Sequence, residues 1–209
     1  LTFAFNRNAQ FIQVLSNSIS PFNSLEVWYP AGKNIEPQIA TQISAGIIRN
    51  IKENKFRVSA EVYQKWLRHQ IDYQDHANML LNPLIEGEIR EAKANAAGVE
   101  LMIRKMSGKL TGWITYTFSK VMITADELNN GESYPAIYDR PHDVAINLNY
   151  KTTKRWSFAA QWILASGSAF SSPTGFYYYQ NNLLPVYDSK NNDRLPPYHR
   201  LDVSATWQL

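Results

Sequence analysis

The sequence contains no cysteine, so it can hold neither a disulfide framework nor a thiolate metal site. It also lacks an apolar run of about 18 residues, so no helix can span a bilayer. Its formal net charge of +3 is too small to indicate a nucleic-acid partner. The first residues, LTFAFNRN, have no charged region or cleavage site of a signal peptide. We expect either that a leader was removed or that the chain begins inside a larger protein.

The sequence does contain segments of about ten residues in which apolar and polar side chains alternate. In the segment 155–165, Trp156, Phe158 and Trp162 alternate with Ser157 and Gln161. Such a period predicts an extended strand with one apolar and one hydratable face. The expected strands are 1–7, 38–51, 55–70, 97–106, 110–121, 142–151, 155–165 and 199–209.

The connections between these strands are alternately short and long. The segments 52–54, 107–109 and 152–154 are short and polar, as in tight hairpin turns. The segments 8–37, 71–96, 122–141 and 166–198 are long. Strict alternation of the two kinds predicts that all long loops emerge at one end of an antiparallel sheet, as in an outer-membrane β-barrel.

The apolar face of each strand is expected to contact lipid, because only an apolar surface with fully paired backbone is tolerated in hydrocarbon. This face carries Val58, Val62, Ile103, Ile146 and Val203. A secreted, glycan-binding β-sandwich could use the same aromatic residues in its core. Its outer strands would normally carry Lys, Glu and Asp, whereas the polar faces here are largely Ser, Thr, Asn and Gln.

A weak internal repeat, DRPHDVAINLNY at 139–150 and YHRLDVSATW at 198–207, places His142, Asp143, His199, Arg200 and Asp202 at the start of two strands. A His/Asp pair could bind a metal or transfer protons. The repetition instead favours a structural role, with Asp139, Arg140, Arg200 and Asp202 in salt bridges or hydrogen bonds. No catalytic or metal-binding residue, cofactor or enzymatic activity is predicted, because the sequence has no GxSxG, P-loop, HExxH or dinucleotide motif.

Two groups of residues are candidates for ligand contact. The polar faces of three expected strands carry both charge signs, which indicates either a mutually neutralised lumen wall or a substrate path. The last long loop combines rigid aromatic rings with an arginine, which suits recognition or simply packing. The wall residues are Arg57, Glu61, Lys65, Glu100 and Arg104, and the loop residues are Phe176, Tyr177, Tyr178, Tyr179, Tyr187 and Arg194.

The order and spacing of several stretches resemble the C-terminal half of the barrel of TonB-dependent outer-membrane receptors of the Bacteroidetes type. The resemblance covers nearly the whole chain. Its most specific elements are GVEL at 98–101, SGKLTGWITYTFS at 107–119, DRPHD at 139–143, KRWSF at 154–158 and YHRLD at 198–202.

The resemblance implies a barrel of about 22 antiparallel strands in the cell outer membrane of a Gram-negative bacterium, closed by an N-terminal plug domain. It implies TonB-dependent import of a scarce nutrient such as a siderophore, cobalamin, oligosaccharide or peptide. The partners would be outer-membrane lipid, the TonB complex through the plug, the nutrient and, in the sugar-importing branch, a surface lipoprotein. Neither plug nor TonB box is recognised in this sequence. A passive or structural barrel without a plug is the alternative.

Overall fold

The computed structural model describes residues 1–16, 26–74, 77, 82–153 and 155–208, so the expected positions Lys154 and Leu209 lie outside the described residues. Within this part the chain is all-β and antiparallel, which confirms these two features of the expected fold class. Its helices are two short 3-10 turns, η1 (Ile85–Glu88) and η2 (Asn129–Gly131). None of the described helices has the length and apolarity needed to cross a membrane.

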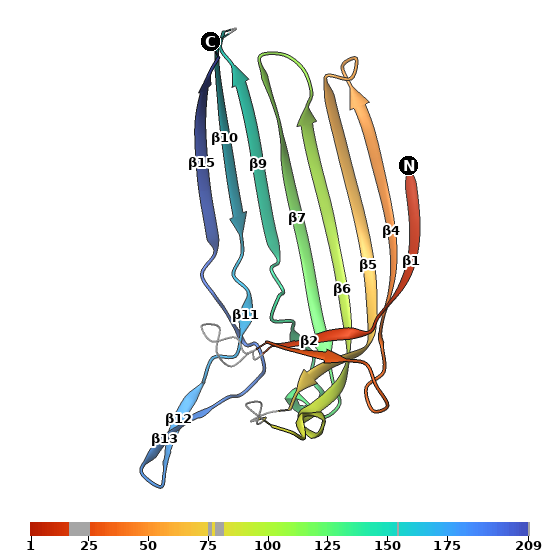
Figure 1. Cartoon of the computed structure of the whole chain (residues 1–209), viewed down its shortest axis with the longest axis vertical. Coiled ribbons are helices and arrows are strands. Elements are labelled where there is room, and N and C mark those ends of the chain that lie inside the picture. The colour runs from red at the N-terminus through yellow and green to blue at the C-terminus, as the bar shows by residue number, and fades with distance from the viewer. Residues whose placement is uncertain (17–25, 75–76, 78–81, 154, 209) are drawn as a thin grey trace.

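One large sheet contains the long strands in the order β1-β4-β5-β6-β7-β9-β10-β15, with β8 paired to β7 (Figure 1). Chain neighbours pair side by side wherever a short turn joins them. The bounds are β1 Thr2–Gln10, β4 Gln38–Ile51, β5 Phe56–Tyr73, β6 Ile89–Lys105, β7 Leu110–Thr124, β8 Tyr134–Pro135, β9 His142–Lys151, β10 Trp156–Ala165 and β15 Tyr198–Trp207. Where the sequence indicated strands 55–70 and 97–106, the observed β5 and β6 extend three and eight residues further towards the loops.

The register aligns the sequence alternation across all strands. Ile146 lies opposite Ile114 and Trp162, whereas the next residue, Asn147, lies opposite Trp113 and Gln161. We call the side that carries Ile146 the apolar face and the side that carries Asn147 the polar face. Large apolar side chains such as Ile103, Val62 and Val203 remain exposed on the apolar face.

All long connections lie at one end of the sheet, called the loop end, and the short turns lie at the other (Figure 1). The long connections contain structure that the alternation did not indicate. Their strands form two hairpins and one small pair: β2 Ile12–Ser16 with β3 Glu26–Pro30, β12 Gly175–Tyr179 with β13 Asn182–Val186, and β11 Ala169–Phe170 with β14 Asp193–Arg194.

A β-bulge interrupts β5 near the loop end. Leu67 pairs with Ala94 and Gln70 with Ala92, so Arg68 and His69 both oppose the single residue Lys93. His69 has a positive φ of 56°, a backbone conformation that non-glycine residues rarely adopt. The extra residue reverses the direction in which odd and even side chains of β5 point. The apolar and polar residues therefore stop alternating after position 67, and the sequence pattern does not indicate where the strand ends.

Beyond the bulge, buried side chains cover both faces of the β5–β6 pair. On the polar face Ala92, Ala94 and Ile123 pack with Tyr134 and Leu128 of the β7–β9 connection. On the apolar face the β2–β3 hairpin contributes Leu15 to a cluster with Ile71, Tyr73 and Ile89. The loop end is therefore a packed cap, and it fixes the positions of the polar groups described next.

Candidate functional site

The expected wall residues share the polar face, but they do not neutralise one another. The register sets Arg57 opposite Arg104 and Glu61 opposite Glu100. No ion pair joins these four side chains in the described structure, and Arg57 instead donates a 3.2 Å hydrogen bond to Asn50. Like charges directly opposite each other are destabilising. The wall therefore does not show the expected mutual neutralisation.

A cavity of about 330 Å³ lies on this wall, lined by Glu61 and Glu100 together with Thr115 and Thr117. Thr117 lies opposite both Glu100 and Asp143, so three carboxylates occupy one lateral row of the sheet. The fifth wall residue, Lys65, lies opposite Ala96, nearer the loop end. The wall therefore presents separate cationic and anionic levels to the space beside the polar face.

The two His/Asp pairs are divided between the faces. The ring of His142 stacks on Tyr116 on the apolar face, with Nδ1 2.9 Å from the tyrosine hydroxyl, whereas Asp143 belongs to the polar face. Likewise His199 lies opposite Leu164, and Asp202 lies opposite Gln161. Within the described ranges no group of three His, Asp or Glu residues is arranged to hold a metal ion.

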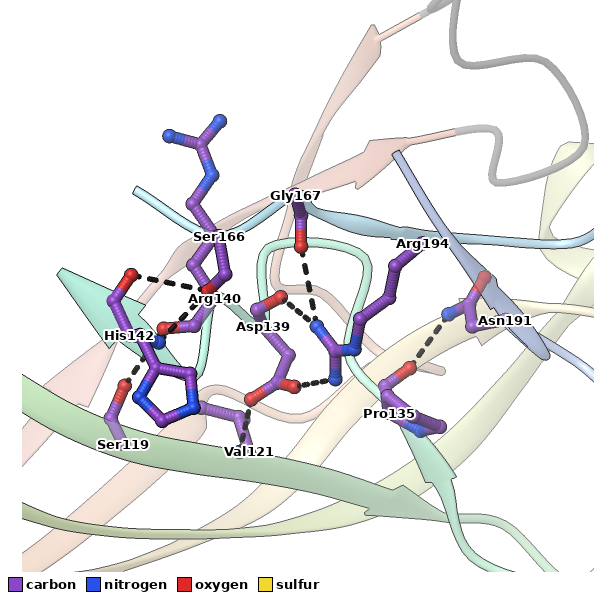
Figure 2. Close-up of polar contacts among 10 residues, drawn as sticks. All are labelled: Ser119, Val121, Pro135, Asp139, Arg140, His142, Ser166, Gly167, Asn191 and Arg194. Atoms are coloured by element: carbon purple, nitrogen blue, oxygen red, sulfur yellow. Dashed lines mark hydrogen bonds and ion pairs between the residues drawn. The ribbon is translucent and has the colours of Figure 1, made fainter. Parts of the chain in front are cut away.

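The expected polar contacts of the repeat are present in part. Arg200 donates to Asp202 through Nε, with a 2.9 Å ion pair to Oδ2. Asp139 does not pair with the adjacent Arg140, because the Arg140 guanidinium is directed away from the Asp139 carboxylate (Figure 2). The carboxylate of Asp139 is fully buried, and it accepts hydrogen bonds from the Val121 amide at 2.7 Å and from Arg194.

Arg194 therefore joins the two longest loops that follow β7. Its guanidinium also donates to the Asp139 carbonyl at 2.8 Å and to the Gly167 carbonyl at 3.3 Å (Figure 2). Gly167 must be glycine here, since a Cβ would lie 1.6 Å from the carbonyl oxygen of Leu195. Nearby, Asn191 donates a 2.7 Å hydrogen bond to the Pro135 carbonyl.

A second contact holds the same loop against β5. The ammonium of Lys190, only 9% exposed, lies 2.9 Å from Asp72 and donates to the Tyr73 carbonyl at 2.8 Å. Asp72 also accepts a 2.7 Å hydrogen bond from Tyr134. These partners lie on the polar face, so the segment 190–194 crosses the polar face at the loop end. We call this the loop clamp, formed by Asp72, Asp139, Lys190 and Arg194.

The aromatic loop residues occupy a different place from Arg194. Phe176, Tyr177, Tyr178 and Tyr179 form β12, in a hairpin that projects away from the sheet (Figure 1). Phe176 and Tyr178 share one side of this hairpin, and Tyr178 is 78% exposed. Tyr187 follows β13 and is half-buried. The structure thus brings four of the six expected residues together and assigns Arg194 to the loop clamp.

Sequence reasoning missed Lys190, Asp72 and the partner of Asp139. Arg194 and Asp139 are 55 positions apart, and Lys190 and Tyr73, the neighbour of Asp72, are 117 positions apart. No local sequence period predicts contacts over such separations. The arrangement suits non-covalent contact, through a charged wall and an exposed aromatic hairpin.

A comparison with protein families gives a match of residues 4–209 to the model described as TonB dependent receptor-like, beta-barrel. A search of curated proteins and a search of solved structures each give no match.

Proposed function

Because the chain belongs to the family of TonB dependent receptor-like β-barrels, which lie in the outer membrane of Gram-negative bacteria, we propose that it forms barrel wall and ligand-contacting loops of an active nutrient importer. The complete barrel would contain about 22 strands and enclose a plug that couples to TonB. The cargo would be a siderophore, cobalamin, oligosaccharide or peptide, taken up by a bacterium of the Bacteroidetes type.

The division of the sheet into two faces is the observation that supports this proposal. Ile103 and Val203, both more than half exposed, belong to a face that would be unstable in water and suits hydrocarbon. Glu61, Glu100 and Arg104 belong to the other face, where a lumen would hydrate them. The long strands form one large sheet. The β2–β3 hairpin covers its apolar face at the loop end, and the rest of this face, including Ile103 and Val203, has no second sheet packed on it within the described residues, which disfavours the β-sandwich alternative.

In this proposal the chain acts by binding and by shaping a path, without covalent chemistry. The β12–β13 hairpin would contact the ligand outside the membrane through tyrosine rings and hydroxyl groups. Movement of the plug would then open a route along the polar face, past the cationic pair Arg57 and Arg104 and the anionic pair Glu61 and Glu100. A surface lipoprotein would be a partner only if the cargo is an oligosaccharide.

Uptake by cells that produce the whole receptor tests the proposal. A panel of labelled siderophores, cobalamin, oligosaccharides and peptides should contain a cargo whose accumulation requires both the receptor and TonB. Collapse of the inner-membrane proton gradient should stop accumulation while surface binding persists. Uptake that continues without TonB would favour the passive barrel instead, and uptake of no cargo despite a folded barrel would contradict an import role.

A further inference from the structure

Four cationic side chains lie on the apolar face close to the loop end. Arg7 follows Phe5 by two residues in β1, Arg68 follows Trp66 in β5, and Lys120 follows Phe118 in β7. Lys93 alternates with the buried Ala92 and Ala94, which lie on the polar face. All four cations are exposed. We call Arg7, Arg68, Lys93 and Lys120 the cationic belt.

The belt has no counter-ion within the described structure. None of the four side chains takes part in an ion pair or a side-chain hydrogen bond there. On this face Glu91 and Glu36 flank His69 at 2.9 and 3.4 Å. Both carboxylates therefore contact His69, and neither forms an ion pair with a cation of the belt.

The β-bulge brings two of these cations close together. Arg68 lies opposite Lys93 on the neighbouring strand, where strands are about 5 Å apart. Like charges in this position repel each other. The polar face carries an equivalent pair, Arg57 and Arg104, but water in a lumen would screen it. On the apolar face no described side chain pairs with Arg68 or Lys93, so an external anion would relieve the repulsion.

The position of the belt matches the level of lipid head groups. It begins where the apolar band ends, beside the half-exposed ring of Trp66, which shares a row with Arg7 and Thr41. Trp is enriched at membrane interfaces, and long cationic side chains extend along apolar surface to place their charge among head groups. Beyond the belt, the β2–β3 hairpin covers the same face through Leu15. The belt thus lies between the apolar band of the sheet and the β2–β3 hairpin that covers the loop end.

We propose that the cationic belt binds phosphate groups of lipid in the outer leaflet. A guanidinium can bind phosphate through two parallel hydrogen bonds, and an ammonium adds a compact charge. Arg68 and Lys93 would share one phosphate, with Arg7 and Lys120 holding further anionic groups of the same lipid layer. The inference rests on the membrane location in the proposed function. It is independent of cargo, because the belt lies on the face opposite the charged wall.

Native mass spectrometry of the whole receptor in detergent tests this inference. The probes are lipid A with two phosphates, the same lipid after dephosphorylation, and inorganic phosphate. The variants are R68Q/K93Q and R7Q/R68Q/K93Q/K120Q. The matched control is R57Q/R104Q, which removes an equivalent cationic pair from the polar face. Heat-modified mobility on a gel reports whether each barrel is folded.

We expect lipid A to bind, and R68Q/K93Q to weaken its binding about 25-fold, since each cation near a lipid surface contributes about a factor of five. The control should bind as the unchanged receptor does. Equal binding of the dephosphorylated lipid would overturn the proposal without any variant. So would equal losses in the control, or competition by millimolar inorganic phosphate, which would indicate a free phosphate site. Loss of lipid binding with intact cargo uptake, or the reverse, separates this inference from the proposed function.

Discussion

Arg194 donates to the fully buried carboxylate of Asp139, although 55 positions separate the two residues in the sequence. The contact joins the connection before β15 to the connection before β9 (Figure 2). Both connections lie across the polar face, where Lys190 contacts Asp72 and Tyr134 packs with Ala92 and Ala94. A loop held in this way cannot sweep freely over the mouth of the barrel. In the proposed function, ligand contact by this loop is therefore confined to its projecting part, the β12–β13 hairpin.

Asp139→Ala should release this loop locally. The variant leaves the Arg194 guanidinium without its anion and the Val121 amide without its acceptor, and such losses at buried sites cost about 3 kcal/mol. Hydrogen exchange of the segment 187–195 in the whole receptor should accelerate about 100-fold, while exchange in β9 and β10 stays slow.

Asp188→Ala is the matched control for this experiment, because Asp188 is exposed in the same loop. It should leave exchange unchanged. Equal acceleration in both variants would show that the loop is not held by Asp139.

The alternation of residue types was sufficient to predict the antiparallel sheet and to divide its side chains between two faces. In a strand the side-chain direction depends only on position, so Ile146 and Asn147 could be assigned from sequence alone. The loop end could not be predicted in this way. Lys190 meets Asp72 through a folded connection whose path depends on packing at Tyr134, and no periodic pattern records that path.

The β12–β13 hairpin is an intermediate case. Its turn residues Gln180 and Asn181 both have positive φ, as in a two-residue hairpin turn. An amide pair between an aromatic run and an aliphatic run could have indicated this turn. The sequence alone places these aromatic residues and Arg194 in one long loop, because sequence distance is a poor guide to position within a long connection.

Ile146→Arg should destabilise the barrel far more than Asn147→Arg. If Ile146 lies near the bilayer midplane, its replacement places a charge in hydrocarbon at a cost of about 2–4 kcal/mol. Asn147 lies on the polar face between Trp113 and Gln161, where a lumen would hydrate the new charge. Unfolding titrations of the whole receptor in lipid bilayers measure both costs. Equal costs would mean that the assignment of faces is wrong.

The contact of the β2–β3 hairpin with η1 should depend on pH. The Tyr29 hydroxyl donates to Glu86, which raises the pKa of Tyr29 to about 12, and Asn34 also donates to Glu86 at 2.6 Å. Both hydrogen bonds lower the pKa of Glu86. A carboxylate with a lowered pKa stabilises the fold above its unfolded pKa, and this stabilisation is lost as pH falls through the lowered value. The raised pKa of Tyr29 stabilises below pH 10 and is lost as pH rises towards about 12.

Docking of this hairpin should therefore be strongest between about pH 4.5 and 10 and weaken on both sides. The chain has no cysteine, so a fluorophore on Val14→Cys can report the position of the hairpin. Glu86→Gln removes the titrating carboxylate and should abolish the acid response. A response that persists in this variant would assign the effect to other groups.

Replacing residues 175–186 with a short Gly-Ser linker should weaken cargo binding while leaving the barrel assembled. This segment carries Phe176 and the three tyrosines, and aromatic rings on an exposed hairpin suit stacking and hydrogen bonding with a ligand. The replacement spares Lys190 and Arg194, so the loop clamp remains and the rest of the loop keeps its place. We expect at least a tenfold loss of affinity, equivalent to the contribution of one or two stacked rings.

Equilibrium binding to the purified whole receptor measures this loss, with a thermal melt as the control for folding. A matched replacement of residues 17–25, which lie between β2 and β3 in the sequence, shortens another connection without removing a tyrosine and should leave affinity unchanged. Unchanged affinity after removal of residues 175–186 from a folded barrel would transfer recognition to the other loops or to the plug. Because the loop clamp remains in this variant, unchanged affinity could not be attributed to a rearrangement of the surrounding loop.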